Sequence, residues 1–151
     1  MYRTTDNDTI TVGELGVRFL VEAADSNGSA SVFECYVPGN SRMPVPHSHD
    51  GFEETIYGVE GTTTWTIDDE TVDIGPGEAV CVRRGQIHGF QNHADIDATF
   101  LAIATPGVFG PAYFREIGDV LAGSLGGPPD LAAIGEVMRR HGLTPARPAT
   151  T

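Results

Sequence analysis

The residues best suited to chemistry form one group near the middle of the chain, where two histidines precede a pair of carboxylates. His47 and His49 are two residues apart, so in an extended chain both imidazoles point to the same face. A short turn then returns the chain and brings Glu53 or Glu54 back toward the imidazoles. Two neutral imidazoles and one carboxylate are good ligands for a divalent transition metal. The spacing therefore predicts a metal site that needs one more ligand.

The best candidate for the remaining ligand is His88, in the stretch Gly-Gln-Ile-His-Gly-Phe-Gln-Asn over residues 85–92. Three histidines and one carboxylate suit Fe(II), Mn(II), Ni(II), Co(II) or Zn(II), and the ligand types alone do not separate these ions. Four protein ligands leave one or two positions for water or substrate, as Lewis-acid or oxygen chemistry requires. The sequence thus predicts one divalent transition metal ion per subunit.

This arrangement resembles the cupin superfamily, whose members carry two short motifs with these ligand types. The first motif is matched by Gly39, His47, His49, Glu54 and Gly61. The second motif is matched by Gly77, Gly85, His88 and Asn92. Together the motifs cover residues 39–92, over a third of the chain, in the right order. The six-residue gap before Gly61 favours Glu54 over Glu53 as the ligand, since a one-residue slip turns a strand side chain to the opposite face.

Two departures from the cupin pattern concern loops rather than ligands. The gap from Gly39 to His47 is longer than is usual in the family, which a loop tolerates. Arg83 stands where the family usually has Pro before the turn that leads to the last ligand. This difference puts a cation near the barrel mouth and makes Arg83 a candidate anion anchor.

The resemblance implies an all-β fold, a small jelly-roll (cupin) β-barrel with two short C-terminal helices. It also implies that His47, His49, Glu54 and His88 hold the metal and that Glu54 doubles as the catalytic base. Among cupins the chain is similar to the quercetin-dioxygenase-like members, which implies a dioxygenase acting on a small aromatic or 1,3-dicarbonyl substrate. Because one fold hosts many functions, three alternatives stay open: a non-redox isomerase or lyase, a metabolite-binding or sensor module without turnover, and an oligomerising scaffold.

Side chains that alternate with the ligands along their strands are expected to face the same interior. On this basis Ile56 points inward with Glu54, and Phe90 and Asn92 point inward with His88. The expected substrate pocket comprises Ile56, Trp65, Phe90, Asn92, Tyr36 and Phe33. The aromatic residues of this set also suit a plain barrel core, and Asn92 also suits a structural hydrogen-bonding position in a turn.

Composition narrows the classes of partner. The formal net charge of −12 and a pI near 4.5 argue against nucleic acid or an anionic membrane and leave a small molecule as the expected partner. No apolar run approaches membrane-spanning length, and we expect no signal peptide. Cys35 and Cys81 lie in apolar strand-like runs, where we expect buried free thiols in a reducing cytoplasm rather than a disulfide. No Gly-rich phosphate loop, nucleophile elbow or paired-cysteine zinc framework competes with the metal site.

The elements that must position these residues are short strands separated by Gly, Pro and Asp. Strands are predicted at 16–24, 29–38, 53–60, 62–68, 71–74, 79–83, 88–92 and 97–104. The first of these is expected at a sheet edge, with a turn over residues 25–28 behind it. Two helices with apolar faces are expected to begin at Pro111 and Asp130, and to end at Gly123 and Gly142.

The chain accordingly divides into a loose N-terminal segment (1–9), a cupin β-barrel (10–107), a C-terminal helical extension (108–143) and a tail (144–151). Both helices are too short to be stable alone in water. We therefore expect them to pack on the barrel or on a second subunit. Because small cupins commonly pair, the resemblance implies a homodimer.

Overall fold

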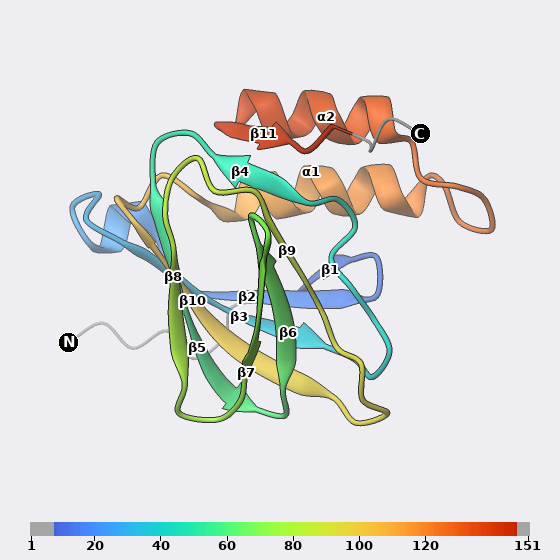
Figure 1. The fold of residues 1–151 in the computed structure, drawn as a ribbon. Helices are drawn as coiled ribbons and strands as arrows, with labels where there is room; N and C mark the ends of the chain where they lie inside the picture. Colours follow the sequence, from blue (N-terminus) through green and yellow to red (C-terminus); the bar gives the residue numbers. More distant parts are fainter. Residues whose placement is uncertain (1–7, 148–151) are drawn as a thin grey trace.

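Two antiparallel sheets packed face to face make up most of the structure, a computed structural model that describes residues 8–147 (Figure 1). The larger sheet contains, in spatial order, β1 (Ile10–Val12), β2 (Leu15–Val21), β3 (Ser31–Val37), β10 (Ala98–Thr105), β5 (Glu53–Glu60) and β8 (Ala79–Val82). The smaller sheet contains β11 (Leu143–Pro145), β4 (His47–His49), β9 (His88–Gln91), β6 (Thr63–Ile67) and β7 (Glu70–Ile74). After β3 the chain crosses repeatedly from one sheet to the other, which gives a jelly-roll arrangement.

The core between the sheets follows from the alternation of side chains along the strands. In β10 the even-numbered residues are buried, whereas the odd-numbered residues are partly or fully exposed. β10 pairs with β3 on one side and with β5 on the other, so the inward side chains of three strands form one layer. Trp65 of β6 closes this layer from the facing sheet, with its ring centroid 4.8 Å from that of Phe90 and 5.1 Å from that of Phe100.

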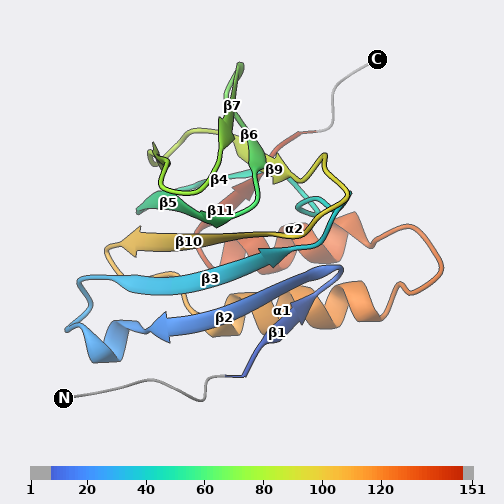
Figure 2. The ribbon, with the colours of Figure 1, turned by 90° about the horizontal axis from the view of Figure 1, so that it is seen from below.

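Both helices lie on the same side of the sandwich (Figure 2). α1 (Pro111–Ala122) starts with Pro after an extended Gly110, and α2 (Leu131–Arg140) is capped by Asp130, whose side chain accepts a hydrogen bond from the N–H of Ala133. α1 packs on β1 and α2 packs on β11, and the two helices also contact each other. Since β1 and β11 are edge strands of the two sheets, the helices cover the side where these edges meet.

The predicted fold class is confirmed: the protein is an all-β jelly roll with two short C-terminal helices. The strands predicted between residues 53 and 104 are present, each within one residue of its predicted bounds. Both helices also begin and end within about two residues of prediction. Neither of them, the only helices of four or more residues in the described part of the chain, is long and apolar enough to cross a membrane.

Several details differ from prediction. β2 was expected at an edge but lies between β1 and β3, because Ile10–Val12 adds an outer strand. Thr144 and Pro145 were expected in a tail but belong to β11, which pairs with β4. Cys81 was expected to be buried but is exposed, because β8 turns Val82 inward and Cys81 therefore outward.

Other expectations for loops and termini have mixed outcomes. A short 3-10 helix (Ala23–Asp25) precedes the turn expected at residues 25–28. Cys35 is a buried free thiol, as expected. The expectations of a loose N-terminal segment and of a linker-like tail fall mostly on residues 1–7 and 148–151, which lie outside the described residues.

Candidate metal centre

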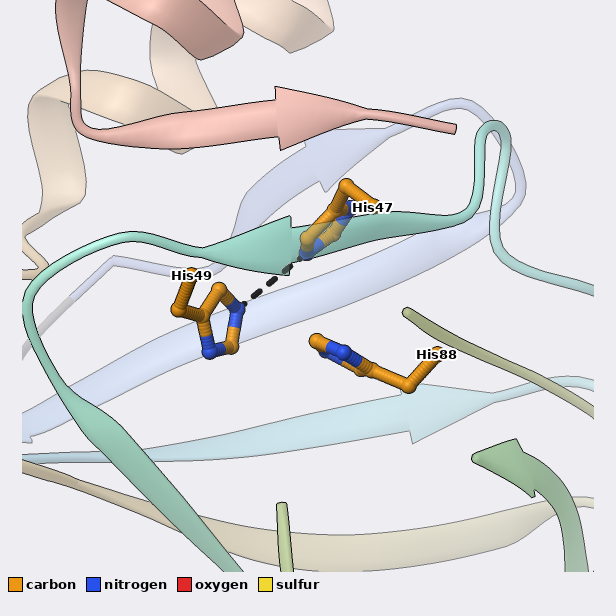
Figure 3. A group of neighbouring side chains, drawn as sticks. All are labelled: His47, His49 and His88. Atoms are coloured by element: carbon orange, nitrogen blue, oxygen red, sulfur yellow. Dashed lines mark hydrogen bonds between the residues drawn. The ribbon is translucent and has the colours of Figure 1, made fainter. Parts of the chain in front are cut away.

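Three histidine side chains meet in the space between the sheets (Figure 3). His47 and His49 both project from β4, and His88 projects from the neighbouring β9, where it pairs directly with His47. The Nε2 atoms of His47 and His49 are 3.2 Å apart, and one ring nitrogen from each of the three residues lies within 4.8 Å of the others. All three side chains are buried. The fold thus brings together histidines from the two sequence motifs.

Backbone carbonyls determine which ring nitrogen is free on two of these histidines. Nδ1 of His47 lies 3.1 Å from the carbonyl oxygen of Val45, and Nδ1 of His88 lies 3.0 Å from that of Gln86. Since a carbonyl oxygen can only accept, each Nδ1 carries the proton and each Nε2 keeps its lone pair. Metal-binding histidines commonly have their second nitrogen held in this way.

The Nε2 atoms of the cluster are the ones that could share a metal ion. Among the described residues, His88 Nε2 and His49 Nδ1 are buried without a hydrogen-bond partner, although buried polar atoms are nearly always paired. A metal ion would account for His88 Nε2, whereas His49 faces His47 through its Nε2 and its Nδ1 lies on the other edge of the ring. Two nitrogens that bind one ion at about 2.1 Å lie at most about 4.2 Å apart. His47 and His49 are therefore already at ligand spacing, and the widest pair in the cluster is slightly beyond it.

Burial keeps the histidines in the protonation state that binds metals. It lowers the pKa of His47 to about 3 and that of His49 to about 2, and it also lowers the pKa of His88. The neighbouring imidazoles add to this effect for the first two residues, because two close positive charges repel each other. The rings are therefore neutral near pH 7, with lone pairs available.

The register of β5 separates the two neighbouring glutamates. Glu54 points into the core, and its Oε2 atom lies 3.6 Å from Nε2 of His49. Glu53 points outward and binds the Arg84 guanidinium, with the shortest contact at 2.6 Å, which lowers the pKa of Glu53 to about 2. Burial instead raises the pKa of Glu54 to about 8. Glu54 is thus the carboxylate beside the histidines, and its coordination of a metal stays a prediction.

A cavity of about 60 Å³ runs from this cluster to the helices. His47 and Glu54 contribute polar surface to it, and most of the remaining wall is aromatic or aliphatic. The residues of the wall come from both sheets, from both helices and from the loop over residues 43–45 that leads into β4. This volume has room for about four to six water molecules.

Of the six residues predicted for the pocket, two line the cavity and four do not. Phe33 and Phe90 line the cavity. Ile56 and Trp65 are fully buried but belong to the core outside the cavity wall, and the indole N–H of Trp65 donates to the Thr63 hydroxyl at 2.9 Å. Core packing, the plainer role considered for Trp65, is the one that the structure shows.

Asn92 and Tyr36 do not line the cavity. The side-chain amide of Asn92 is buried in a loop, where its N–H groups donate to the carbonyl oxygens of Val37 and Ile96 and its oxygen accepts from the backbone N–H of Ala94. Tyr36 lies on the outer face of β3, 36% exposed, and its hydroxyl donates to a neighbouring carboxylate. Placing Tyr36 in the pocket was wrong, because it lies three positions after the inward Phe33 and side chains alternate along a strand.

Three aromatic residues near the site were not predicted to be there. Phe52 is buried, with its ring stacked on that of His49 at a centroid distance of 4.2 Å. Phe109 lies 5.6 Å from the His49 ring, and Tyr113 of α1 packs on Phe109 at 5.0 Å. The apolar face of α1 indicates from the sequence that Tyr113 is buried. It does not indicate that Tyr113 lies beside the histidine cluster. Arg83 is exposed, so its role as an anion anchor stays a prediction.

Comparison with protein families identifies the architecture around this site. The model of the cupin domain family (Cupin_2) matches residues 32–104, a span that runs from β3 to β10 and includes the three histidines and Glu54. The chain belongs to the cupin superfamily. This cupin is 25% identical over 120 residues to quercetin 2,3-dioxygenase of Bacillus subtilis (strain 168). The matched segment is 80% of this chain but 35% of that protein. It thus spans about a third of the length of this curated relative.

Solved structures of other cupin-like proteins share the fold. The polyketide cyclase RemF from Streptomyces resistomycificus superposes with a TM-score of 0.62 and is 29% identical, covering 77% of this cupin and 91% of that chain. A predicted oxalate decarboxylase from Thermotoga maritima superposes with a TM-score of 0.63 at 21% identity, covering 70% of this cupin and 99% of that chain. The second likeness shows the fold alone.

Proposed function

We propose that this cupin is a mononuclear metal-dependent enzyme that acts on a small organic substrate in its cavity, by a reaction of the dioxygenase type. The observation that carries the proposal is the continuity of the cluster with the cavity, because His47 and Glu54 line the same space as Phe33 and Phe90. A substrate enclosed by these rings would present its polar group to the cluster. The likeness to quercetin 2,3-dioxygenase supports the reaction type.

In this proposal His47, His49, His88 and Glu54 hold one divalent transition metal ion. When bound, such an ion supplies a Lewis acid for a substrate oxygen and, if it is redox-active, reactivity toward O₂. The apolar wall excludes water and orients the substrate body. Burial raises the pKa of Glu54 to about 8 in the metal-free protein, a bound cation would oppose this rise, and in the proposal the Glu54 carboxylate acts as the base beside the metal. This suits removal of a proton from a phenol or an enol.

The cavity favours a substrate of one ring or a short 1,3-dicarbonyl compound. A space of about 60 Å³ is smaller than the cavity of about 150 Å³ that holds benzene, so even one ring requires some movement of the walls, and the three rings of a flavonol require much more. Pockets of this kind bind the body of a ligand by apolar contact and fix its orientation through a few polar groups. Quercetin itself is therefore not the substrate that we propose.

A non-redox reaction is the second candidate, and the likeness to the polyketide cyclase favours it. This cupin covers 91% of the cyclase but 35% of the dioxygenase, and it is also slightly more similar in sequence to the cyclase. In that case the same cluster would stabilise an enolate during ring closure or isomerisation. The two candidates share the site and differ in their need for oxygen.

Oxygen uptake separates the candidates. Protein loaded with Fe(II), Mn(II) or Zn(II) would be mixed with single-ring phenols and 1,3-diketones, and both oxygen and substrate would be followed. A dioxygenase consumes oxygen together with substrate when the metal is redox-active, but not with zinc. Conversion without oxygen, supported by zinc, would identify the non-redox reaction. Ligand binding without any conversion would contradict both and favour a sensor.

A further inference from the structure

The hydroxyl of Tyr113 is a polar group in the cavity wall that the proposed function leaves unused. Tyr113 is 4% exposed and lines the cavity together with Glu54 and His47. Within residues 8–147 its hydroxyl makes no hydrogen bond, and it is not one of the fully buried polar atoms without a partner, so it keeps accessible surface at the cavity. A largely buried hydroxyl without a protein partner is favourably placed to bond to a ligand. A ligand in the cavity would supply the missing partner.

The Tyr113 ring is held in place from several sides. It stands in the first turn of α1, with ring centroids 5.0 Å from Phe109 and 5.1 Å from Phe114. From α2, the His141 ring packs against it edge to face at 5.7 Å. His141 in turn bonds to Glu116 in the middle of α1, which links the C-terminal end of α2 to α1. The hydroxyl therefore has a defined position and is suited to recognising one atom of a ligand.

Few other polar groups face this space. The polar side chains of the lining are Cys35, His47, Glu54 and Tyr113, and the rest of the wall is apolar. Burial raises the pKa of Tyr113, and the Glu54 carboxylate adds to the effect. The Tyr113 hydroxyl thus stays protonated and can donate a hydrogen bond. A ligand whose first oxygen lies at the histidines and Glu54 has a second polar point available at Tyr113.

We propose that Tyr113 determines substrate specificity, its hydroxyl donating a hydrogen bond to a second oxygen atom of the ligand. The ligand class is then a small ring or short chain with two oxygen functions, such as a benzenediol, a hydroxyketone or a dicarbonyl compound. The inference rests on the proposed function in that a ligand occupies the cavity, but it requires no particular reaction.

The test compares three probes, phenol, resorcinol and hydroquinone, by calorimetry without oxygen on zinc-loaded protein. Neither diol can chelate one ion, so its second oxygen reports on the wall of the cavity. We expect wild-type protein to bind at least one diol about fivefold to tenfold more tightly than phenol, the effect of one hydrogen bond. We expect Tyr113→Phe, which keeps the ring and its packing, to lose this preference while binding phenol as before.

Tyr57→Phe is the matched control, because it removes a hydroxyl from a tyrosine on the outer face of β5 that is 44% exposed. It should keep the wild-type preference. The proposal is overturned if Tyr113→Phe keeps the preference, if Tyr57→Phe loses it equally, or if wild-type protein prefers neither diol. Metal content of the same samples separates the two proposals. A protein that takes up no metal, yet shows the Tyr113-dependent preference, would contradict the metal-dependent enzyme and leave the role of Tyr113 intact.

Discussion

At the scale of single residues, the two adjacent glutamates of β5 differ most in their surroundings. Glu54 is buried beside His49, whereas Glu53 is partly exposed and bound by Arg84. The two side chains have the same chemistry and lie one residue apart. Substituting each glutamate in turn therefore distinguishes an effect on the candidate site from the effect of losing one negative charge.

We predict that Glu54→Gln lowers turnover by about 10²- to 10⁴-fold, as expected for loss of a general base, and also weakens metal binding. Glu53→Gln should leave turnover and metal affinity nearly unchanged, since it weakens only outward contacts with the guanidinium and the backbone N–H of Arg84. Steady-state rates and metal titrations of both variants check this. Equal effects from the two substitutions would show that the inward position of Glu54 has no special role.

The sequence predicts that His47 and His49 converge, because residues two apart in an extended chain point to the same face, whereas Glu54 and His88 come from other strands and were assigned from the resemblance to the cupin motifs. It does not predict Phe109 and Tyr113, which reach the site from beyond the last barrel strand. Which face of a helix covers a cavity depends on tertiary packing, and no local pattern carries that information. The error for Tyr36 has a different origin, since strict alternation from Phe33 would have excluded it.

At the scale of elements, the strands that pair with β4 hold it in place, and the position of β4 sets the positions of His47 and His49. This strand has three residues, with β9 on one side and the C-terminal β11 on the other. β11 pairs Leu143 with His49 and Pro145 with His47. The end of the chain is therefore part of the site's framework, although it touches no substrate.

We predict that Leu143→Ala destabilises the protein by about 2–5 kcal/mol, because Leu143 is fully buried and its loss leaves a cavity. It should also weaken metal binding by loosening β4. Leu131→Ala is the control, since Leu131 is 58% exposed on α2. Urea unfolding and metal titration measure both effects. Unchanged metal affinity in a clearly destabilised Leu143→Ala would show that β11 does not position the histidines.

The contact between the helices should depend on pH. Glu116 of α1 bonds to His141 and Arg140 at the end of α2, and these bonds, His141 first, lower the pKa of Glu116. A lowered carboxyl pKa adds stability above the unfolded value, and this contribution is lost as the pH falls through the folded value. Glu116→Gln should therefore melt below wild type at neutral pH, and the difference should begin to shrink near the ordinary glutamate pKa of about 4.3 and vanish below the lowered pKa of folded Glu116.

Melting temperatures over this pH range check the prediction, with Glu136→Gln on the exposed side of α2 as the control. A difference that stays constant from neutral to acid pH would mean that the Glu116 carboxylate does not contribute through its charge.

The elements that sequence predicts best are those with clear alternation, such as β5 and β10. The three-residue strands β1 and β11 are missed because so short a segment has little pattern of its own. Each forms a strand only by pairing with a neighbour at a sheet edge: β1 pairs with β2, and β11 pairs with β4.

At the scale of the whole molecule, we propose a homodimer, with contact through the outer face of the larger sheet. Tyr36 of β3 and Tyr57 and Val59 of β5 are exposed there, on the two strands that flank β10. Exposed apolar side chains on one face often mark an interface.

Light scattering should give twice the subunit mass, and Tyr57→Glu together with Val59→Glu should shift it to the monomer. Val108→Glu, at a separate exposed site, should stay dimeric. A wild-type monomer at all concentrations would contradict the proposal.

The most direct test of the account is the metal content of the protein, purified without added metal or a histidine tag and measured by elemental mass spectrometry. His88→Ala and His93→Ala would be measured beside it, since His88 belongs to the buried cluster and His93 is exposed in a loop. We predict near-stoichiometric Fe, Mn, Ni, Co or Zn in wild type and His93→Ala, and loss of the metal in a folded His88→Ala. Wild-type protein that is metal-free and refuses added metal, or His88→Ala at full occupancy, would contradict the account.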